Sequence, residues 1–226
     1  MIQRRRVAQT HHEWLSLVDV SGAFLSEPVL LEVFPQGIPV LDVPTTRVDR
    51  SMGDVHPAGN PHYSLDPGMA PAVTGTILEG LARMAPPHRA IFERNRQEFL
   101  SRLALAMTRW SASMAPFKGA KVVVYHPLWS YLLTRFGLVQ AGTVEDRPGI
   151  PPTPGHLTKL ITLMKEEGVK LVIVEPWSDQ KLAERLAREA GVKAVILATA
   201  VGSVKGATSY IDAVDYNVNA LAQALR

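Results

Sequence analysis

The chain has 226 residues, of which 46% are hydrophobic and 20% are charged, and its formal net charge is +3. This length and composition suit one large globular domain or two lobes, and the small charge gives no reason to expect a nucleic-acid partner. Cysteine is absent, which excludes disulfides, thiolate metal sites and a cysteine nucleophile. Any metal must therefore be held by histidine, carboxylate or hydroxyl oxygen, which suits zinc or manganese better than copper(I).

From the sequence we expect neither an export signal nor a membrane anchor. The arginine triplet at 4–6 is followed by the polar run 7–13 rather than by an apolar stretch. No segment approaches the ~18 apolar residues of a membrane helix. We expect a helix over about residues 1–20 and short strands over residues 28–34 and 38–43.

Two helical patterns fill the middle of the chain. The first runs from about Pro71 to Met84. The second runs from about His88 to Met114, with apolar residues recurring at spacings of three, four and seven. A helix of roughly 28 residues would be about 42 Å long, which is more than one small lobe needs.

The last hundred residues alternate between strand and helix. The strand patterns are β-branched and apolar, as in parallel strands buried on both faces, so we predict an open α/β sheet. Gly137, Gly168 and Gly191 each stand before a strand, where left-handed helix caps belong. The expected strands cover residues 121–125, 138–144, 169–174 and 192–197, and the expected helices 128–136, 154–167, 179–190 and 209–225.

Two histidines lie at positions where the backbone is expected to be rigid. His62 lies in the turn-rich stretch 59–67, where residues that precede proline are pushed out of the helical region. His126 ends the apolar run that begins at Val122. Two histidines presented by turns and strand ends, far apart in sequence, suggest a site assembled between two parts of the fold.

These stretches resemble the metal-binding solute-binding proteins of zinc and manganese ABC importers. That family has the pattern Asn-Pro-His-x-Trp-Leu-Asp-Pro, matched here by residues 60–67 with Ser64 in place of Trp. It also has a strand that ends in His or Glu before an aromatic-rich helix and Gly-Leu, matched by residues 126–138. The Pro-Gly-Ile-Pro-Pro-x-Pro-x-His-Leu segment of one branch fits residues 148–157.

The resemblance covers roughly residues 40–226 and implies a two-lobed α/β metal-receptor fold, with open parallel sheets joined by a long spine helix. It divides the chain into a partial N-terminal lobe (1–86), the spine helix (87–116) and a C-terminal α/β lobe (117–226). Family members have a complete first lobe, so the chain is either truncated or naturally short.

The resemblance also implies the ligands. The family holds its metal with four, and two of them correspond to His62 and His126. A third, a first-lobe histidine, lies upstream of anything present here. The fourth is an aspartate just before the tyrosine of the final helix, where Thr208 and Ser209 offer no carboxylate.

The expected function is binding of a divalent metal, zinc first and manganese second, in the interlobe cleft, and delivery to an ABC permease. The expected location, by resemblance, is the periplasm or the cell surface. His56, Glu145 and Glu175 are weaker candidates for the missing ligands. His56 also reads as a loop residue and Glu175 as a group at a helix start, while His62 and His126 themselves also read as structural histidines.

Other histidines and aromatic residues fit structural roles. His11 and His12 face different ways on a helix and read as surface, and His156 reads as a first-turn residue. Trp129 and Tyr131 read as core.

Two alternatives remain open. One is a metal-incompetent remnant or interaction module of the same fold. The other is an α/β enzyme with His126 as acid or base beside Glu145 or Glu175. No dinucleotide, phosphate-loop or nucleophile-elbow motif supports the latter, so we predict that the protein is not an enzyme.

Overall fold

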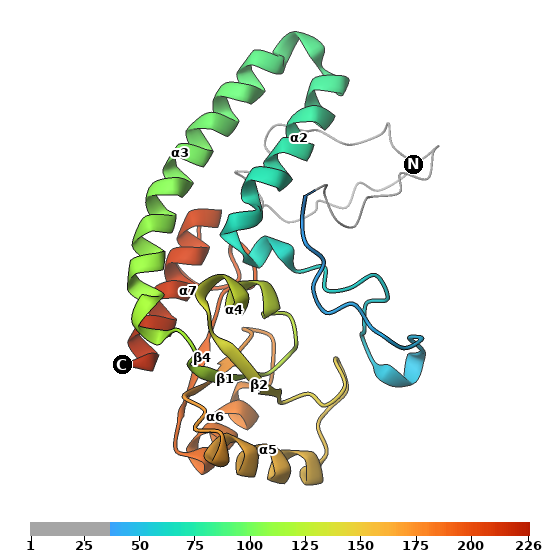
Figure 1. Ribbon diagram of the computed structural model, residues 1–226, viewed down its shortest axis with the longest axis vertical. Helices are drawn as coiled ribbons and strands as arrows, with labels where there is room; N and C mark the ends of the chain where they lie inside the picture. Colours follow the sequence, from blue (N-terminus) through green and yellow to red (C-terminus); the bar gives the residue numbers. More distant parts are fainter. Residues whose placement is uncertain (1–36) are drawn as a thin grey trace, which may run out of the picture.

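The computed structural model describes residues 37–226, which form a parallel α/β sheet below a long helical hairpin (Figure 1). The helix expected over residues 1–20 and the strand expected over 28–34 lie outside the described residues.

The sheet has four parallel strands, in the order β2-β1-β3-β4. They are β1 (Lys121–Val124), β2 (Val139–Thr143), β3 (Leu171–Val174) and β4 (Lys193–Ile196). Each strand lies within its expected range and is one or two residues shorter than that range. The α/β class with a parallel sheet is confirmed.

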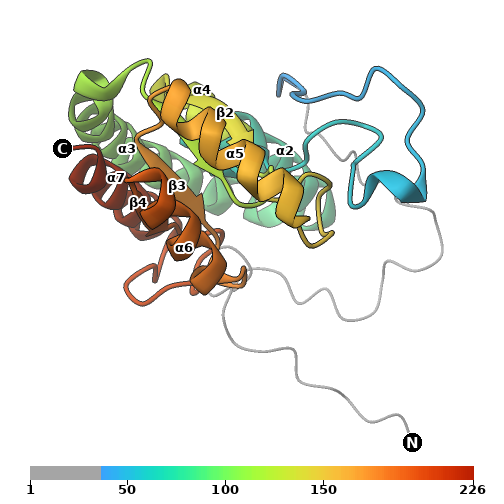
Figure 2. The same ribbon diagram turned by 90° about the horizontal axis from the view of Figure 1, so that it is seen from below.

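Helices cover both faces of the sheet. On one face lie α4 (Ser130–Phe136) and α7 (Tyr210–Leu225), and on the other α5 (Pro154–Glu166) and α6 (Gln180–Ala190). Figure 2, seen from below, shows α5 and α6 in front of the strands. Gly137 ends α4 in the left-handed conformation, with φ of 69°, as the sequence predicted.

Alternate residues of each strand serve the two faces. In β1, Val122 and Val124 pack with the helices α3, α4 and α7, whereas Val123 packs with α5 and α6. All three valines are fully buried. Burial on both faces is the reason why residues 122–124 of β1 and all four residues of β3 are apolar, rather than every second one.

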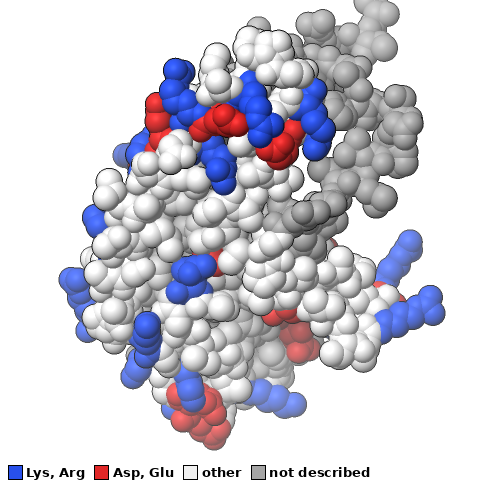
Figure 3. Space-filling view, turned by 45° about the horizontal axis from the view of Figure 1, so that its top comes forward, with Lys and Arg blue, Asp and Glu red and all other residues white. Residues whose placement is uncertain are grey.

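The hairpin consists of α2 (Ala70–Met84) and α3 (Arg89–Met114). The end of α3 nearest the sheet is buried, and Trp110 donates from Nε1 to Asp215 on α7 at 2.5 Å. The far end carries mixed charges (Figure 3), including Arg89, which bridges to Glu79 at 2.8 Å. Within residues 37–226, neither of these helices nor any other combines the length and apolarity needed to cross a bilayer.

The strand expected over residues 38–43 is wrong. Pro39 has no N–H to offer a ladder, and Asp42 adopts a left-handed φ of 54°, which ends any extended run. The backbone instead pairs with a side chain, since the Tyr131 hydroxyl accepts from Leu41 N and donates to Pro39 O, each at 3.1 Å. The short 3-10 turns are η1 (Arg50–Met52), η2 (Tyr63–Leu65), η3 (Pro67–Met69), η4 (Pro86–His88) and η5 (Ala115–Phe117).

Candidate metal site

Three polar residues follow neighbouring strands at one edge of the sheet. His126 comes shortly after β1, Glu145 shortly after β2, and Glu175 directly after β3. Strand β1 is flanked by β2 on one side and β3 on the other. Successive strands are therefore added first on one side of β1 and then on the other, which makes β1 the point where the strand order reverses. Open α/β sheets bind ligands at the carboxyl ends of their strands, at such a switch in strand order.

Glu145 fixes the orientation of His126. The Nδ1 atom of the buried imidazole lies 2.7 Å from Glu145 Oε2, and the same oxygen accepts from Gly149 N at 2.7 Å. A carboxylate beside Nδ1 keeps the proton on that nitrogen. The lone pair on Nε2 is then available to a metal ion.

Glu175 is enclosed rather than open to a ligand. Its side chain is 0% exposed and accepts from Trp129 Nε1 and Ser178 Oγ, both at 2.6 Å. Burial raises the pKa of this carboxyl, and the hydrogen bonds oppose the shift. Because it also accepts from His126 N at 3.4 Å, Glu175 supports the backbone that carries the histidine.

The Asn-Pro-His turn holds His62 through its own side chains. Asn60 is buried, its Oδ1 accepts from His62 N at 2.9 Å, and its Nδ2 donates to Asp42 Oδ2 at 2.8 Å. The same amide reaches Pro127 O at 3.5 Å, so it also connects the turn with the His126 segment.

An ion pair fixes the same turn on α4. Asp66 accepts from Arg135 Nε at 2.5 Å and from Nη2 at 2.9 Å, and its Oδ1 also accepts from Gly68 N at 2.7 Å. On the other side, the Tyr210 hydroxyl donates to Ser64 O at 2.8 Å. The geometry therefore positions His62 against the C-terminal half of the chain.

His62 and His126 line one pocket of about 190 Å³, together with His56, Asp42 and Asp54; we call it the histidine pocket. The rings of His56 and His62 meet edge to face, with centroids 5.8 Å apart. Burial lowers the pKa of His62, the neighbouring imidazoles of His56 and His126 lower it further, and Asp54 opposes them. These groups therefore act on one another electrostatically across the pocket.

Among residues 37–226, no three histidine, aspartate or glutamate side chains converge closely enough to hold a metal ion. At the position where the resemblance implies an aspartate, Thr208 and Ser209 instead form hydrogen bonds at the start of α7. There Ser209 Oγ accepts from Asp212 N at 3.2 Å, and Thr208 Oγ1 donates to Asp212 Oδ2 at 2.6 Å. His156 lies outside the pocket, with Nε2 2.9 Å from Thr143 O.

The sequence did not single out three further residues that lie at or beside the histidine pocket. Asp42 and Asp54 line the pocket, and Trp177 packs its ring on His126 at 5.4 Å while remaining 60% exposed. Asp54 stands next to the His56 motif, which could have singled it out. Nothing local marks Asp42 or Trp177, because their places depend on where distant segments fold.

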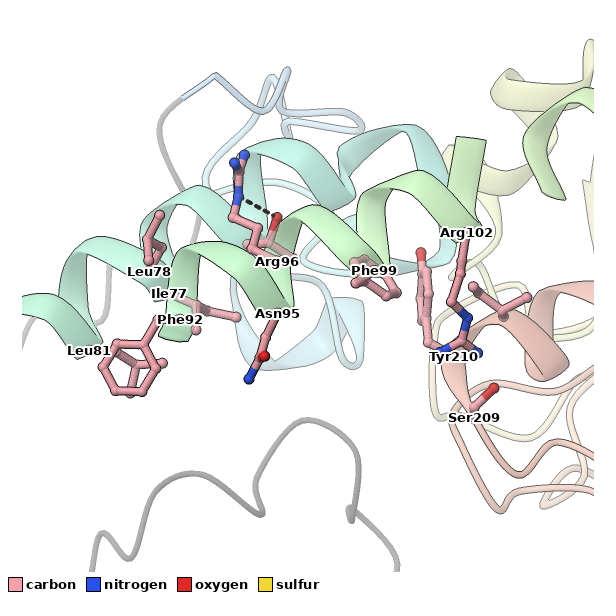
Figure 4. Close-up of a pocket in the computed structure, with 12 residues that line it drawn as sticks. Ile77, Leu78, Leu81, Phe92, Asn95, Arg96, Phe99, Arg102, Ser209 and Tyr210 are labelled. Atoms are coloured by element: carbon pink, nitrogen blue, oxygen red, sulfur yellow. Dashed lines mark hydrogen bonds between the residues drawn. The ribbon is translucent and has the colours of Figure 1, made fainter. Parts of the chain in front are cut away.

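A separate apolar hollow of about 240 Å³ lies between α2, α3 and the start of α7 (Figure 4). Ile77 and Leu81 of α2 face Phe92 and Phe99 of α3, and the ring of Phe99 lies 6.2 Å from that of Tyr210. Its lining contains no imidazole or carboxylate, so it offers no metal site.

The parallel sheet and the long helix, with two histidines lining one pocket, have the fold of the metal-receptor class of solute-binding proteins. The chain belongs to the ZnuA family, described as zinc-uptake complex component A, periplasmic, whose family model matches residues 7–224. This is a family of transport components rather than of enzymes.

Comparisons with individual proteins agree with this family membership. The chain is 27% identical over 172 residues to the high-affinity zinc uptake system protein ZnuA of Bacillus subtilis, covering 74% of this chain and 54% of the relative. A solved ZnuA structure superposes with a TM-score of 0.67 at 26% identity, covering 85% of this chain and 68% of that one. The protein FpvC of Pseudomonas aeruginosa, solved with Ni2+, gives a TM-score of 0.64 at 26% identity and covers 84% and 69%. The chain thus spans about half the length of its curated Bacillus relative.

Proposed function

We propose that this protein binds a divalent transition metal in the histidine pocket, with zinc preferred over manganese, and delivers it to an ABC-type import permease. The observation that carries the proposal is the meeting of His62 and His126, which are far apart in sequence, in one pocket at the carboxyl edge of the sheet. Membership of a zinc-uptake family and the similarity to the zinc uptake protein of Bacillus subtilis support it.

The donor set favours zinc. Neutral imidazole suits zinc, whereas manganese prefers carboxylate and water. His126 is already oriented for this role, since Glu145 holds its Nδ1 and leaves Nε2 for the ion. A nickel-bound structure among the relatives shows that the fold accommodates other divalent ions.

The proposal extends to location and architecture. The family description is periplasmic, so we infer that the protein works in the periplasm or at the cell surface. We assign residues 1–86 to a partial N-terminal lobe, 87–116 to the spine helix and 117–226 to the C-terminal lobe. The helix α3 (Arg89–Met114) supports this division, because it fills the range expected for the spine helix.

Calorimetric titration of the metal-stripped protein with zinc, and then with manganese, tests the proposal. We expect 1:1 binding of zinc with a Kd below about 1 μM and weaker binding of manganese. The variant His62→Ala/His126→Ala should abolish binding. Millimolar binding, or binding that the double variant leaves unchanged, would contradict the proposal.

A second candidate function is that of a fold-retaining interaction module that no longer binds metal. The observation in its favour is that no three donors of the described residues converge to ligand distance. The same titration separates the two candidates, because the module would give no saturable zinc binding in either the wild type or the double variant.

A further inference from the structure

The pocket distinguishes among the three candidates for the missing ligands. Glu145 Oε2 is already occupied by His126 Nδ1 and Gly149 N, and Glu175 is enclosed by its own hydrogen bonds. Neither carboxylate lines the histidine pocket, whereas His56 does. Of the three candidates, only His56 therefore faces the two histidines, and it does so beside the pocket residues Asp42 and Asp54.

His56 is held in a loop with fixed ends. Asp54 N donates to Pro148 O at 2.8 Å, and Gly59 N donates to His56 O at 3.1 Å. Gly53 has a positive φ of 80°, and a Cβ there would lie 2.2 Å from Pro148 O, so the backbones approach as closely as only glycine allows. This contact ties the loop to the segment in which Gly149 holds Glu145.

The spacing of the rings suits a shared ion. With Zn–N bonds of about 2.0–2.1 Å and tetrahedral angles, two imidazoles on one zinc have centroids about 5 Å apart. The centroids of His56 and His62 are 5.8 Å apart without an ion. Since no three donors of residues 37–226 converge to ligand distance, the proposal requires these side chains to move when an ion binds.

We propose that His56 is the third metal ligand, so that a loop within this chain supplies the imidazole which the resemblance assigns to an upstream lobe. The inference rests on the proposed metal-binding function. Three protein nitrogens with a fourth position open to water or to Asp54 form an exchangeable zinc site. Such a site suits a carrier that must also release its cargo.

The test is titration of zinc into metal-stripped wild type and into His56→Ala, His56→Gln, His62→Ala and His126→Ala. Removing His56 should weaken zinc binding on the order of tenfold to 100-fold, at least as much as the loss of an outer-shell partner costs. The 1:1 stoichiometry should remain. Zinc-edge X-ray absorption should show one imidazole fewer in His56→Gln than in the wild type.

His88→Ala is the matched control, because His88 is exposed at the far end of the hairpin and should leave zinc binding unchanged. Thermal unfolding without metal verifies that each variant folds. Wild-type affinity in His56→Ala and His56→Gln, with binding lost in His62→Ala and His126→Ala, overturns this inference and leaves the proposed function standing. Absence of zinc binding in the wild type overturns the proposed function and the inference with it.

Discussion

The two walls of the histidine pocket are held by different kinds of interaction. His126 follows a strand whose residues, such as Val122 and Val123, are fully buried between two layers of helices. His62 lies in the segment 37–69, which has no strand and only short 3-10 turns. Apolar burial is spread over many contacts, whereas this segment depends on a few polar ones.

Three of those polar contacts reach the C-terminal half. Arg135 binds Asp66, Tyr131 binds the backbone near Leu41, and Tyr210 binds the backbone at Ser64. The comparison teaches that stability and site geometry are separable here. Substitutions in the core beside His126 should lower the free energy of unfolding of the whole domain. Substitutions that remove one of these three polar contacts should chiefly change the position of His62.

The largest effect is expected from Trp129→Ala. Trp129 is 0% exposed and also donates to the buried Glu175, so its loss leaves both a cavity and a carboxylate without one of its donors. We expect a loss of about 3–5 kcal/mol in the free energy of unfolding, measured in urea. Trp177→Ala is the control, since this exposed ring should cost no more than about 0.5 kcal/mol.

A similar cost for both tryptophan variants would contradict the view that the His126 wall is held by the core. It would mean that the ring of Trp177 on His126 contributes as much as the interior does.

A smaller loss is expected from Arg135→Ala. The substitution leaves Asp66, whose side chain is 5% exposed, without its cationic partner. We expect the free energy of unfolding to fall by about 2 kcal/mol, in the range for hydrogen bonds to charged groups. Zinc binding should weaken as well, because the turn that carries His62 loses its contact with α4.

Arg188→Ala serves as the matched control for this ion pair, since Arg188 pairs with Glu184 on the exposed face of α6 at 3.9 Å. Arg188→Ala should lower the free energy of unfolding by only about 0.3–0.5 kcal/mol. Zinc affinity unchanged in Arg135→Ala would show that the ion pair does not position His62.

The smallest effect is expected from Tyr131→Phe. This substitution removes only the hydroxyl that binds Leu41 N and Pro39 O and keeps the buried ring. We expect a cost of about 1 kcal/mol in urea unfolding and faster amide exchange at Leu41. Unchanged exchange at Leu41 would exclude the hydroxyl as the anchor of residues 38–43.

Much of the fold could be predicted because its signals are local. Apolar β-branched runs predicted all four strands, and Gly137 predicted the end of α4. The prediction of a strand over residues 38–43 was wrong. The apolar residues of this run are typical of a strand, but Pro39 and Asp42 prevent one. A pattern of hydrophobicity cannot show that the hydrogen-bonding partner is a tyrosine far along the chain.

The sequence by itself determined the order of strands and helices from α2 onward, the family pattern, and the identity of His62 and His126 as candidate ligands. Hydrophobic periodicity and turn chemistry act over a few residues, so they can be read locally. Only the tertiary structure decided that Glu145 orients His126, that Glu175 is enclosed, and that His56 faces the pocket. The reason is that such side-chain neighbours are set by chain segments brought together in folding.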